Sequence, residues 1–305
     1  MRTLDSLAER CSAQRYIRSE RSGRVMRILL ALLVAVSGAV AFLPRLLDAR
    51  PRSFRSRFVR GRETLLARVV APTAAVTEAD LAPLPALLQI YLRRVGVTGR
   101  PRVRNVRVLF DAQMRSSATS AWMQATATQY EFFDPPARLF HMKASRSGVP
   151  LDVLHEYVDG AATFQVRIAG LIPMVNKSGI GITHDETVTL MNDVLVLAPA
   201  AMLDLPFDFE PIDERSVRAT FRNAGLVVTA TLTFDAAGDL VGFVSADRAN
   251  DREGGAAIWS TPISAYAEVD GIRVGTHGDA NWIDATGEWT YGRFVIRSIA
   301  YNVDA

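Results

Sequence analysis

Cysteine and lysine are scarce in this chain, which has one cysteine, Cys11, and only two lysines, Lys143 and Lys177. Cys11 precedes the apolar run described below, so the sequence after that run has no disulfide, no thiol nucleophile and no cysteine metal site. No basic stripe combines with stacking aromatic residues in the later chain, so nucleic acid is not expected as a partner. Because no disulfide is available after the apolar run, the core must be held together by packing.

Motifs that carry common chemistry are also missing from the sequence. There is no phosphate-binding glycine loop, no dinucleotide fingerprint and no G-x-S-x-G nucleophile elbow. The four histidines, His141, His155, His184 and His277, include no pair at H-x-x-x-H spacing. We therefore expect no metal, no cofactor and no catalytic residue, and the sequence favours a protein that is not an enzyme.

Charge is unevenly distributed along the chain. The net charge is +3, the hydrophobic fraction is 49% and the charged fraction is 22%. Most globular proteins have a similar composition, so the chain is neither disordered nor a protein with many membrane spans. Arginine is concentrated in the first hundred residues, while the remainder is richer in aspartate. Positive charge is therefore concentrated in the N-terminal region.

An uncharged apolar run of 16 residues, Ile28 to Leu43, lies between two groups of arginines. It is shorter than the ~20 residues that usually span a bilayer and longer than a minimal signal core. Two interpretations remain open, a signal cleaved after Ala41 in the A-x-A pattern at 39–41, or a retained anchor. Met26-Arg27 directly precedes the run and would itself be a compact start, in which case residues 1–25 come from a misannotated start site.

The arginines around this run give little information on orientation, because seven precede Ile28 and seven lie between Arg45 and Arg62. A large domain after such a segment is normally exported. We expect a bacterial plasma-membrane protein with a single span and an extracytoplasmic C-terminal domain. Cleavage and secretion is the alternative.

The stretch from Arg50 to Arg62 sets two phenylalanines four residues apart among arginines. A basic amphipathic stretch of this kind can lie on anionic lipid headgroups, although a solvated linker is an equal alternative. The residues expected to contact the membrane are Arg45, Arg50, Arg52, Phe54, Arg55 and Phe58.

Helical signals follow before the strands begin. Residues 63–70 are a helical candidate, and Thr77 is a candidate N-cap for a segment that continues through Leu84 to Val95. Gly96 is the expected stop. This short helix would cover an open edge or end of a sheet.

From residue 102 onward the apolar period changes from helical spacing to two. Alternating segments separated by turn residues, such as Asp159-Gly160, predict antiparallel neighbours joined by hairpins. Thr183 followed by Asp185 and Glu186 predicts a capped helix between two groups of strands. We expect a mainly β (α+β) fold, a curved antiparallel sheet or half-barrel of about ten strands packed on one central helix.

These signals divide the chain into four parts. The expected boundaries are a basic tail at 1–27, the apolar segment at 28–44, an arginine-rich linker at 45–71 and one β-rich domain at 72–305.

Several residues between Leu84 and Val303 resemble an uncharacterised bacterial family of unknown function. The matching residues are Gly160, Pro199, Asp247, Arg248, Pro262, Gly271 and Trp282. The layout is similar to lipoprotein-sorting carriers, in which a half-open barrel covered by helices holds an acyl chain. By this analogy the resemblance implies an apolar concavity.

The loop at 246–255 and the aromatic residues of the strands supply a candidate ligand site. The arginines of this loop could bind a phosphate or carboxylate headgroup, or pair with the loop's own carboxylates. The candidate residues are Asp247, Arg248, Arg252, Trp122, Trp259 and Trp282. The expected ligand is an apolar or lipid-like molecule, and the expected partner is membrane lipid.

Two other functions remain open. An enzyme acting on an envelope lipid or ester could use His184, Asp185 or Glu186 as a base, although a capped helix start explains every one of these residues and is the favoured interpretation. A structural envelope domain could instead add a partner strand at an open sheet edge. The sequence does not fix the oligomeric state.

Overall fold

The computed structural model describes residues 46–72, 74–248, 257–269, 271–285 and 287–304. Pro51–Ala305 form one compact unit, and the residues up to Arg50 form another, of which only 46–50 are described. The apolar run at 28–43 and Arg45 lie outside the described residues. Among the helices that are described, none is both long enough and apolar enough to cross a membrane.

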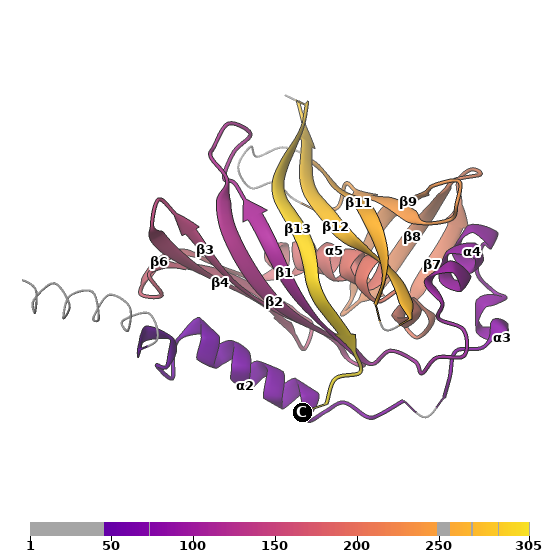
Figure 1. Cartoon of the computed structure of the whole chain (residues 1–305), viewed down its shortest axis with the longest axis horizontal. Helices are drawn as coiled ribbons and strands as arrows, with labels where there is room; N and C mark the ends of the chain where they lie inside the picture. The colour runs from indigo at the N-terminus through magenta and orange to yellow at the C-terminus, as the bar shows by residue number, and fades with distance from the viewer. Residues whose placement is uncertain (1–45, 73, 249–256, 270, 286, 305) are drawn as a thin grey trace, which may run out of the picture. The chain divides into compact units, whose positions relative to one another are not determined.

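The compact unit is built on one antiparallel sheet of 13 strands (Figure 1). Its order is β6-β5-β4-β3-β2-β1-β13-β12-β11-β10-β9-β8-β7, so β6 and β7 are the two edges and β1 pairs with β13 in the middle. The strands are β1 Asn105–Met114, β2 Met123–Phe133, β3 Pro136–Arg146, β4 Val149–Val158, β5 Ala161–Ile168, β6 Ile172–Ser178, β7 Phe207–Pro211, β8 Ser216–Asn223, β9 Leu226–Phe234, β10 Leu240–Ser245, β11 Ile258–Val269, β12 Ile272–Asp284 and β13 Gly287–Tyr301.

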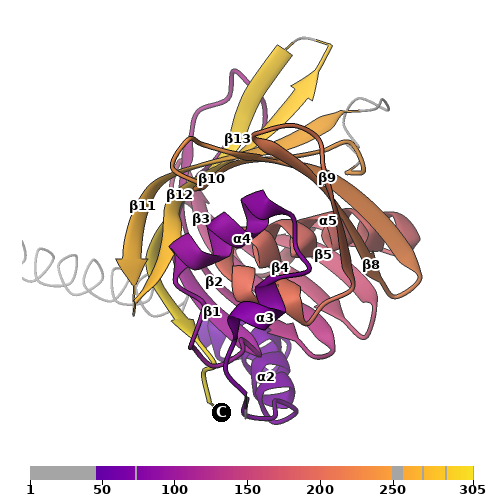
Figure 2. The same cartoon turned by 90° about the vertical axis from the view of Figure 1, so that its right-hand side faces the viewer.

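The strand order explains why a helix crosses the sheet. β1 to β6 form one meander that runs outward to the first edge, and β7 to β13 form a second that returns from the opposite edge. The connection between the edges is α5 (Ile180–Leu197) followed by the short helix η1 (Pro199–Leu203). Figure 2 shows the curved sheet wrapped around α5. The concave face is therefore occupied by this helix.

Most of α5 is buried, and both of its ends are held by hydrogen bonds to other elements. Its last turn leaves carbonyl groups without partners inside the helix. Tyr91 Oη donates to the Leu195 carbonyl at 3.0 Å, and Tyr301 Oη donates to the Leu197 carbonyl at 2.8 Å. At the other end, Thr183 Oγ1 accepts a hydrogen bond from the Ala162 amide of β5 at 3.0 Å.

The prediction that Thr183 is the N-cap residue of this helix is wrong. The helix begins at Ile180 with Gly179 as its N-cap residue, and Thr183 lies inside the first turn. The Thr183 hydroxyl donates to the Gly179 carbonyl at 2.9 Å. A threonine hydroxyl can bond the carbonyl one turn back instead of capping the helix, so the sequence pattern alone does not distinguish the two positions.

The expected mainly β fold with an open curved antiparallel sheet is confirmed, with 13 strands instead of about ten. The predicted hairpin at Asp159-Gly160 is present, with φ of 51° and 74°, as a turn with two left-handed residues requires. The strands that the sequence did not reveal are the two edges, β6 and β7. Each contains a proline, Pro173 or Pro211, which weakens a strand signal but is tolerated at an edge.

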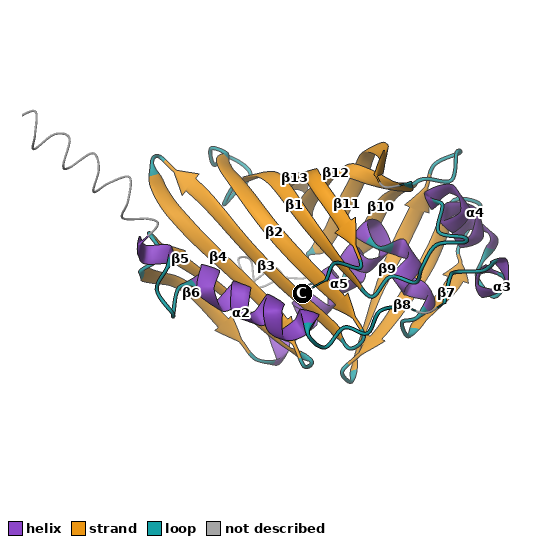
Figure 3. Cartoon of the chain, turned by 60° about the horizontal axis from the view of Figure 1, so that its bottom comes forward, coloured by secondary structure: helices purple, strands orange, loops and turns teal. Residues whose placement is uncertain are grey.

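The arginine-rich stretch that was expected to be a linker forms α2 (Phe54–Leu66), which packs on the convex face of the sheet (Figure 3). Phe54 and Phe58 are buried (1% and 5% exposed) in a second hydrophobic cluster with Tyr130, Phe132 and Leu139. The compact unit accordingly begins at Pro51. Strands β2, β3 and β4 are therefore covered on both faces.

The helical segment expected between Thr77 and Val95 forms two separate helices. Thr77 caps α3 (Glu78–Leu81) through a hydrogen bond from its amide to Asp80 Oδ2 at 2.7 Å. A second helix, α4 (Ala86–Val95), ends at Gly96 in the left-handed conformation, as expected. Pro85, the N-cap residue of α4, lies between the two helices.

Candidate functional site

A cavity of about 540 Å³ lies between α5 and the concave face of the sheet. Alternation on β3 shows how the strands build it. Arg138, Phe140, Met142 and Ala144 line the cavity, whereas Leu139 packs with α2 on the convex face. A pocket of this volume is in the range that holds one small-molecule ligand.

Much of the lining is apolar. The residues come from strands on both sides of the sheet centre and from α5. They include Phe110, Met114, Met123, Phe140, Met142, Ala144, Leu151, Val153, Phe164, Val166, Met174, Val175, Ile182, Val196, Leu197, Phe294 and Ile296. Methionine and aromatic side chains can adjust to ligands of different shape. The cavity can thus hold an elongated apolar group.

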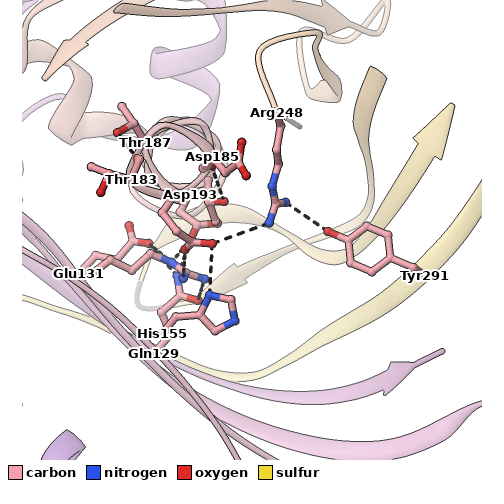
Figure 4. Close-up of polar contacts among 12 residues, drawn as sticks. Gln129, Glu131, His155, Thr183, Asp185, Thr187, Asp193, Arg248 and Tyr291 are labelled. Atoms are coloured by element: carbon pink, nitrogen blue, oxygen red, sulfur yellow. Dashed lines mark hydrogen bonds and ion pairs between the residues drawn. The ribbon is translucent and has the colours of Figure 1, made fainter. Parts of the chain in front are cut away.

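One polar cluster beside α5 includes Gln129, His155 and Asp193 (Figure 4). It is centred on Arg138 of β3. Its Nη1 donates to Glu186 Oε2 at 3.2 Å, and its Nε donates to Asp193 Oδ2 at 2.8 Å. Its Nη2 donates to Gln129 Oε1 of β2 at 3.1 Å. Because Glu186 and Asp193 are two turns apart on α5, one arginine ties the helix to the sheet along that length.

Glu186 of α5 is a buried carboxylate that remains charged. Its Oε1 lies 3.2 Å from His155 Nδ1 of β4 and 3.8 Å from Arg248 Nη2. Burial alone would raise the pKa of Glu186, but the opposing effects of His155, Arg138 and Arg248 lower it to about 2. A carboxylate with so low a pKa is a weak base near neutral pH.

Glu131 of β2 is fully buried beside this cluster and behaves in the opposite way. Its Oε1 accepts a hydrogen bond from Gln129 Nε2 at 2.7 Å. Burial raises the pKa of Glu131 well above its ordinary value, and the nearby charge of Asp193 raises it further. Both effects disfavour the charged form of Glu131 in the protein interior.

A second polar group, centred on Arg248, lies where the loop after β10 meets β11, β12 and β13. Arg248 Nη1 donates to Tyr291 Oη at 3.2 Å, and Trp259 Nε1 donates to the same oxygen at 3.0 Å. The guanidinium carbon lies 4.5 Å from the ring centroid of Trp259 and 5.8 Å from that of Trp282. Stacking on aromatic rings orients a guanidinium without using its donors.

Three of the residues expected to bind ligand come together here. Arg248, Trp259 and Trp282 all line the cavity. Asp247 does not line it, because its Oδ2 accepts hydrogen bonds from the amide and hydroxyl of Thr229 at 2.6 and 2.8 Å. Trp122 also lies elsewhere, stacked with Arg115 and Arg293. Arg252 lies outside the described residues.

The residues expected to contact membrane divide into two groups. The side chains of Arg52 and Arg55 are exposed, and so is that of Arg50 in the separate unit. Phe54 and Phe58 are not available to lipid in this structure, because both are buried between α2 and the sheet. Their spacing of four places them on one helix face, and that face packs on protein.

The polar cluster contains residues that sequence reasoning missed, namely Gln129, Glu131, Arg138 and Asp193. Alternation in the strands that carry Gln129 and Arg138 is typical of half-exposed strands, whose polar side chains face solvent. Since α2 covers the outer face, the polar side chains point inward instead. A strand with large apolar residues at the alternate positions, such as Tyr130 and Phe132, was the available signal.

The three residues considered as catalytic bases differ in their position relative to the cavity. His184 does not line the cavity, whereas Asp185 and Glu186 do. Glu186 is engaged by His155 and Arg138. Among the described residues there is no group of three or more histidine, cysteine, aspartate or glutamate side chains suited to a metal ion.

Solved structures similar to this chain include the following two. One is described as a domain of an outer membrane lipoprotein-sorting protein from Vibrio parahaemolyticus, with 9% identity, coverage of 66% of this chain and 87% of the other, and a TM-score of 0.37. The other is a LolA superfamily protein from Nitrosomonas europaea, with 9% identity, coverage of 76% and 96%, and a TM-score of 0.41.

No curated protein matches the chain. A family model does match it, over residues 74–294, which include every described strand except the end of β13. The resemblance to an uncharacterised family is thereby confirmed. The chain belongs to DUF6544, a family of unknown function.

Proposed function

We propose that this protein binds one elongated amphipathic molecule, an apolar or lipid-like chain with an anionic headgroup, in the cavity between α5 and the sheet. The single observation that carries this proposal is the composition of the cavity wall. Apolar side chains form most of it, and one guanidinium, that of Arg248, is held among aromatic rings at one part. The headgroup chemistry that suits a guanidinium is a carboxylate or a phosphate.

The apolar part of the ligand would supply most of the affinity. Each methylene removed from water contributes about 0.8 kcal/mol, so a long chain binds well without specific contacts. The headgroup would fix the direction in which the molecule enters. Arg248 suits that role because its side chain is only 15% exposed, and an ion pair is stronger where water is excluded.

The proposal does not include catalysis. The carboxylate nearest to Arg248, that of Glu186, is ionised and held by Arg138 and His155, and this suits a structural counter-charge. Removing the negative charge of Glu186 would leave two buried arginines without it. We expect its replacement to affect folding before it affects any reaction.

We also propose that the protein works at the bacterial envelope, either anchored by the apolar run at 28–43 or released after Ala41. The uncharged run and its flanking arginines support this. Mass spectrometry of the N-terminus of the protein isolated from membrane and soluble fractions tests it. Intact protein in a soluble cytoplasmic fraction would contradict the proposal.

Contact quenching of tryptophan fluorescence tests ligand binding directly. Trp259, Trp282 and Trp289 line the cavity and Trp122 does not. A brominated fatty acid in the cavity should quench the fluorescence in a saturable, stoichiometric manner. The quenched fraction should fall in Trp259→Phe and persist in the matched variant Trp122→Phe. Absence of saturable quenching in the wild-type protein would remove the proposal.

The headgroup assignment has its own test. Arg248→Met should weaken binding of the brominated fatty acid by about tenfold or more, since a hydrogen bond to a charged group contributes roughly 1.5–3 kcal/mol. Binding of the matching brominated alcohol should change little. Arg218→Met, at an exposed position of β8 outside the cavity, is the control. Equal losses for acid and alcohol would mean that Arg248 does not contact the headgroup.

A further inference from the structure

Large apolar side chains are exposed together at one corner of the sheet. Val149 begins β4, while Leu171, Ile172 and Met174 form the turn and the start of edge strand β6. Their exposed fractions lie between 47% and 61%. We call these four residues the β6-edge surface. Apolar clusters of this kind on a protein surface usually mark a contact site.

Strand pairing brings the four residues side by side. Ile168 of β5 pairs with Ile172 on one side and with Leu151 of β4 on the other. The Ala169 amide donates to the Pro150 carbonyl at 2.8 Å, which joins the β5–β6 turn to the start of β4. Two turns that are distant in sequence therefore form one corner.

The β6-edge surface is continuous with the cavity. Met174 is 55% exposed and also lines the cavity, as do its neighbours Val175 and Lys177. An apolar molecule that leaves the cavity beside β6 would meet Met174 before it meets water. A surface at this opening can thus exchange ligand with an apolar phase without exposing the ligand to solvent.

Positive charge surrounds the same corner. Arg146, which pairs with Val149, is exposed, and so are Arg52 and Arg55 at the start of α2. Arg167 of β5, whose partner on β6 is Pro173, donates through Nη1 to the Arg52 carbonyl at 3.1 Å. Arginines beside exposed apolar groups match an interface of anionic headgroups over hydrocarbon.

The course of the chain points to the same occupant. Arg52 lies next to Pro51, where the compact unit begins, and its carbonyl contacts β5 beside this corner. The sequence just before that point contains the uncharged run Ile28 to Leu43, an apolar segment of nearly membrane-spanning length. A membrane that holds this run would lie within a short length of chain from the β6-edge surface.

We infer that the β6-edge surface docks on an anionic lipid bilayer and presents the cavity opening to it. The inference assigns membrane contact to Leu171, Ile172 and Met174 in place of Phe54 and Phe58, which are buried. Arg52 and Arg55 keep the role expected from the sequence. The reason for docking at this opening rests on the proposed function, whereas the contact itself has an independent readout.

Site-specific fluorescence on the full chain tests the contact. Cys11 is the only cysteine, so Cys11→Ser with Ile172→Cys gives one attachment point for an environment-sensitive dye. The matched control is Val227→Cys, which is 53% exposed on β9 toward the other edge of the sheet. Both proteins are reconstituted in vesicles of phosphatidylcholine with or without phosphatidylglycerol, in which some lipids carry a nitroxide quencher on the acyl chain.

We expect the dye at position 172 to be quenched severalfold more than the dye at 227, and more strongly when phosphatidylglycerol is present. Replacing Arg52, Arg55 and Arg146 by glutamine should remove the dependence on phosphatidylglycerol. Equal, weak quenching at both positions would overturn the inference. A blue shift at 172 that grows with protein concentration without vesicles would also overturn it, because a second copy would then cover the surface.

Tryptophan quenching by the brominated fatty acid, measured on the same proteins, separates the two proposals. Saturable ligand binding without dye quenching at 172 would leave the proposed function standing and remove membrane docking. Dye quenching at 172 without ligand binding would keep the docking surface and remove the carrier role.

Discussion

Arg138 Nη1 of β3 donates a hydrogen bond to Glu186 Oε2 of α5 at 3.2 Å inside the ligand-sized cavity. The same guanidinium reaches Asp193 of α5 at 2.8 Å. The helix that limits the cavity is thus fixed by buried charge as well as by packing. Mutations in this contact should change stability and cavity shape together.

Glu186→Gln should destabilise the protein at neutral pH. The folded-state pKa of about 2, against an ordinary value of 4.5, corresponds to roughly 3 kcal/mol of stability. Because this pKa is depressed, the contribution is complete above about pH 4.5 and is lost as the pH falls toward 2. Urea unfolding at neutral pH and across that acid range should show a gap between wild type and variant that closes on acidification.

Exposed Glu214→Gln is the control for that series and should follow the wild type at every pH. A Glu186→Gln variant as stable as wild type at neutral pH would mean that Arg138 and Arg248 need no counter-charge at this position.

Glu131→Gln should have the opposite pH dependence. The pKa of Glu131 is raised by burial and by Asp193, so the folded state holds a proton that the unfolded chain releases above about pH 4.5. The wild type therefore loses stability as the pH rises through the range between the two pKa values, and the variant lacks this loss. Thermal unfolding from acid to mildly alkaline pH should show the variant gaining on the wild type. Parallel curves would contradict the assignment.

Phe54→Ala should cost about 3–5 kcal/mol, because it removes a buried aromatic side chain from the cluster between α2 and the sheet. The neighbouring Arg55→Ala, at an exposed position, should change the free energy of unfolding by less than ~0.5 kcal/mol. Chemical unfolding of both variants measures the difference. If Phe54→Ala were as mild as Arg55→Ala, α2 would not be part of the folded core.

Val153→Phe should compete with the ligand for space. Val153 of β4 lines the cavity, so a larger side chain there can occupy empty volume with little strain. We expect severalfold weaker binding of the brominated fatty acid, measured by tryptophan quenching, and a nearly unchanged melting temperature. Val227→Phe, at an exposed position of β9, should leave both unchanged. Full binding by a folded Val153→Phe protein would place the ligand elsewhere.

Local sequence determined the features that depend on local conformation. The Asp159-Gly160 turn follows from two adjacent residues that tolerate positive φ, and Gly96 ends α4 for the same reason. Alternation along each strand predicted the antiparallel meanders. The aromatic or basic character of Arg248, Trp259 and Trp282 pointed to three residues of the cavity wall, but the same criterion also selected Trp122, which does not line the cavity.

Only the tertiary structure decided which face of a strand points to the cavity and what covers the other face. Gln129 and Arg138 point to α5 because α2 takes the outer face of β2 and β3. The same packing buries Phe54, whereas Ile172 lies exposed on the edge strand β6. Alternation separates two faces of a strand but does not distinguish one buried face from two, since burial depends on elements that lie far away in the sequence.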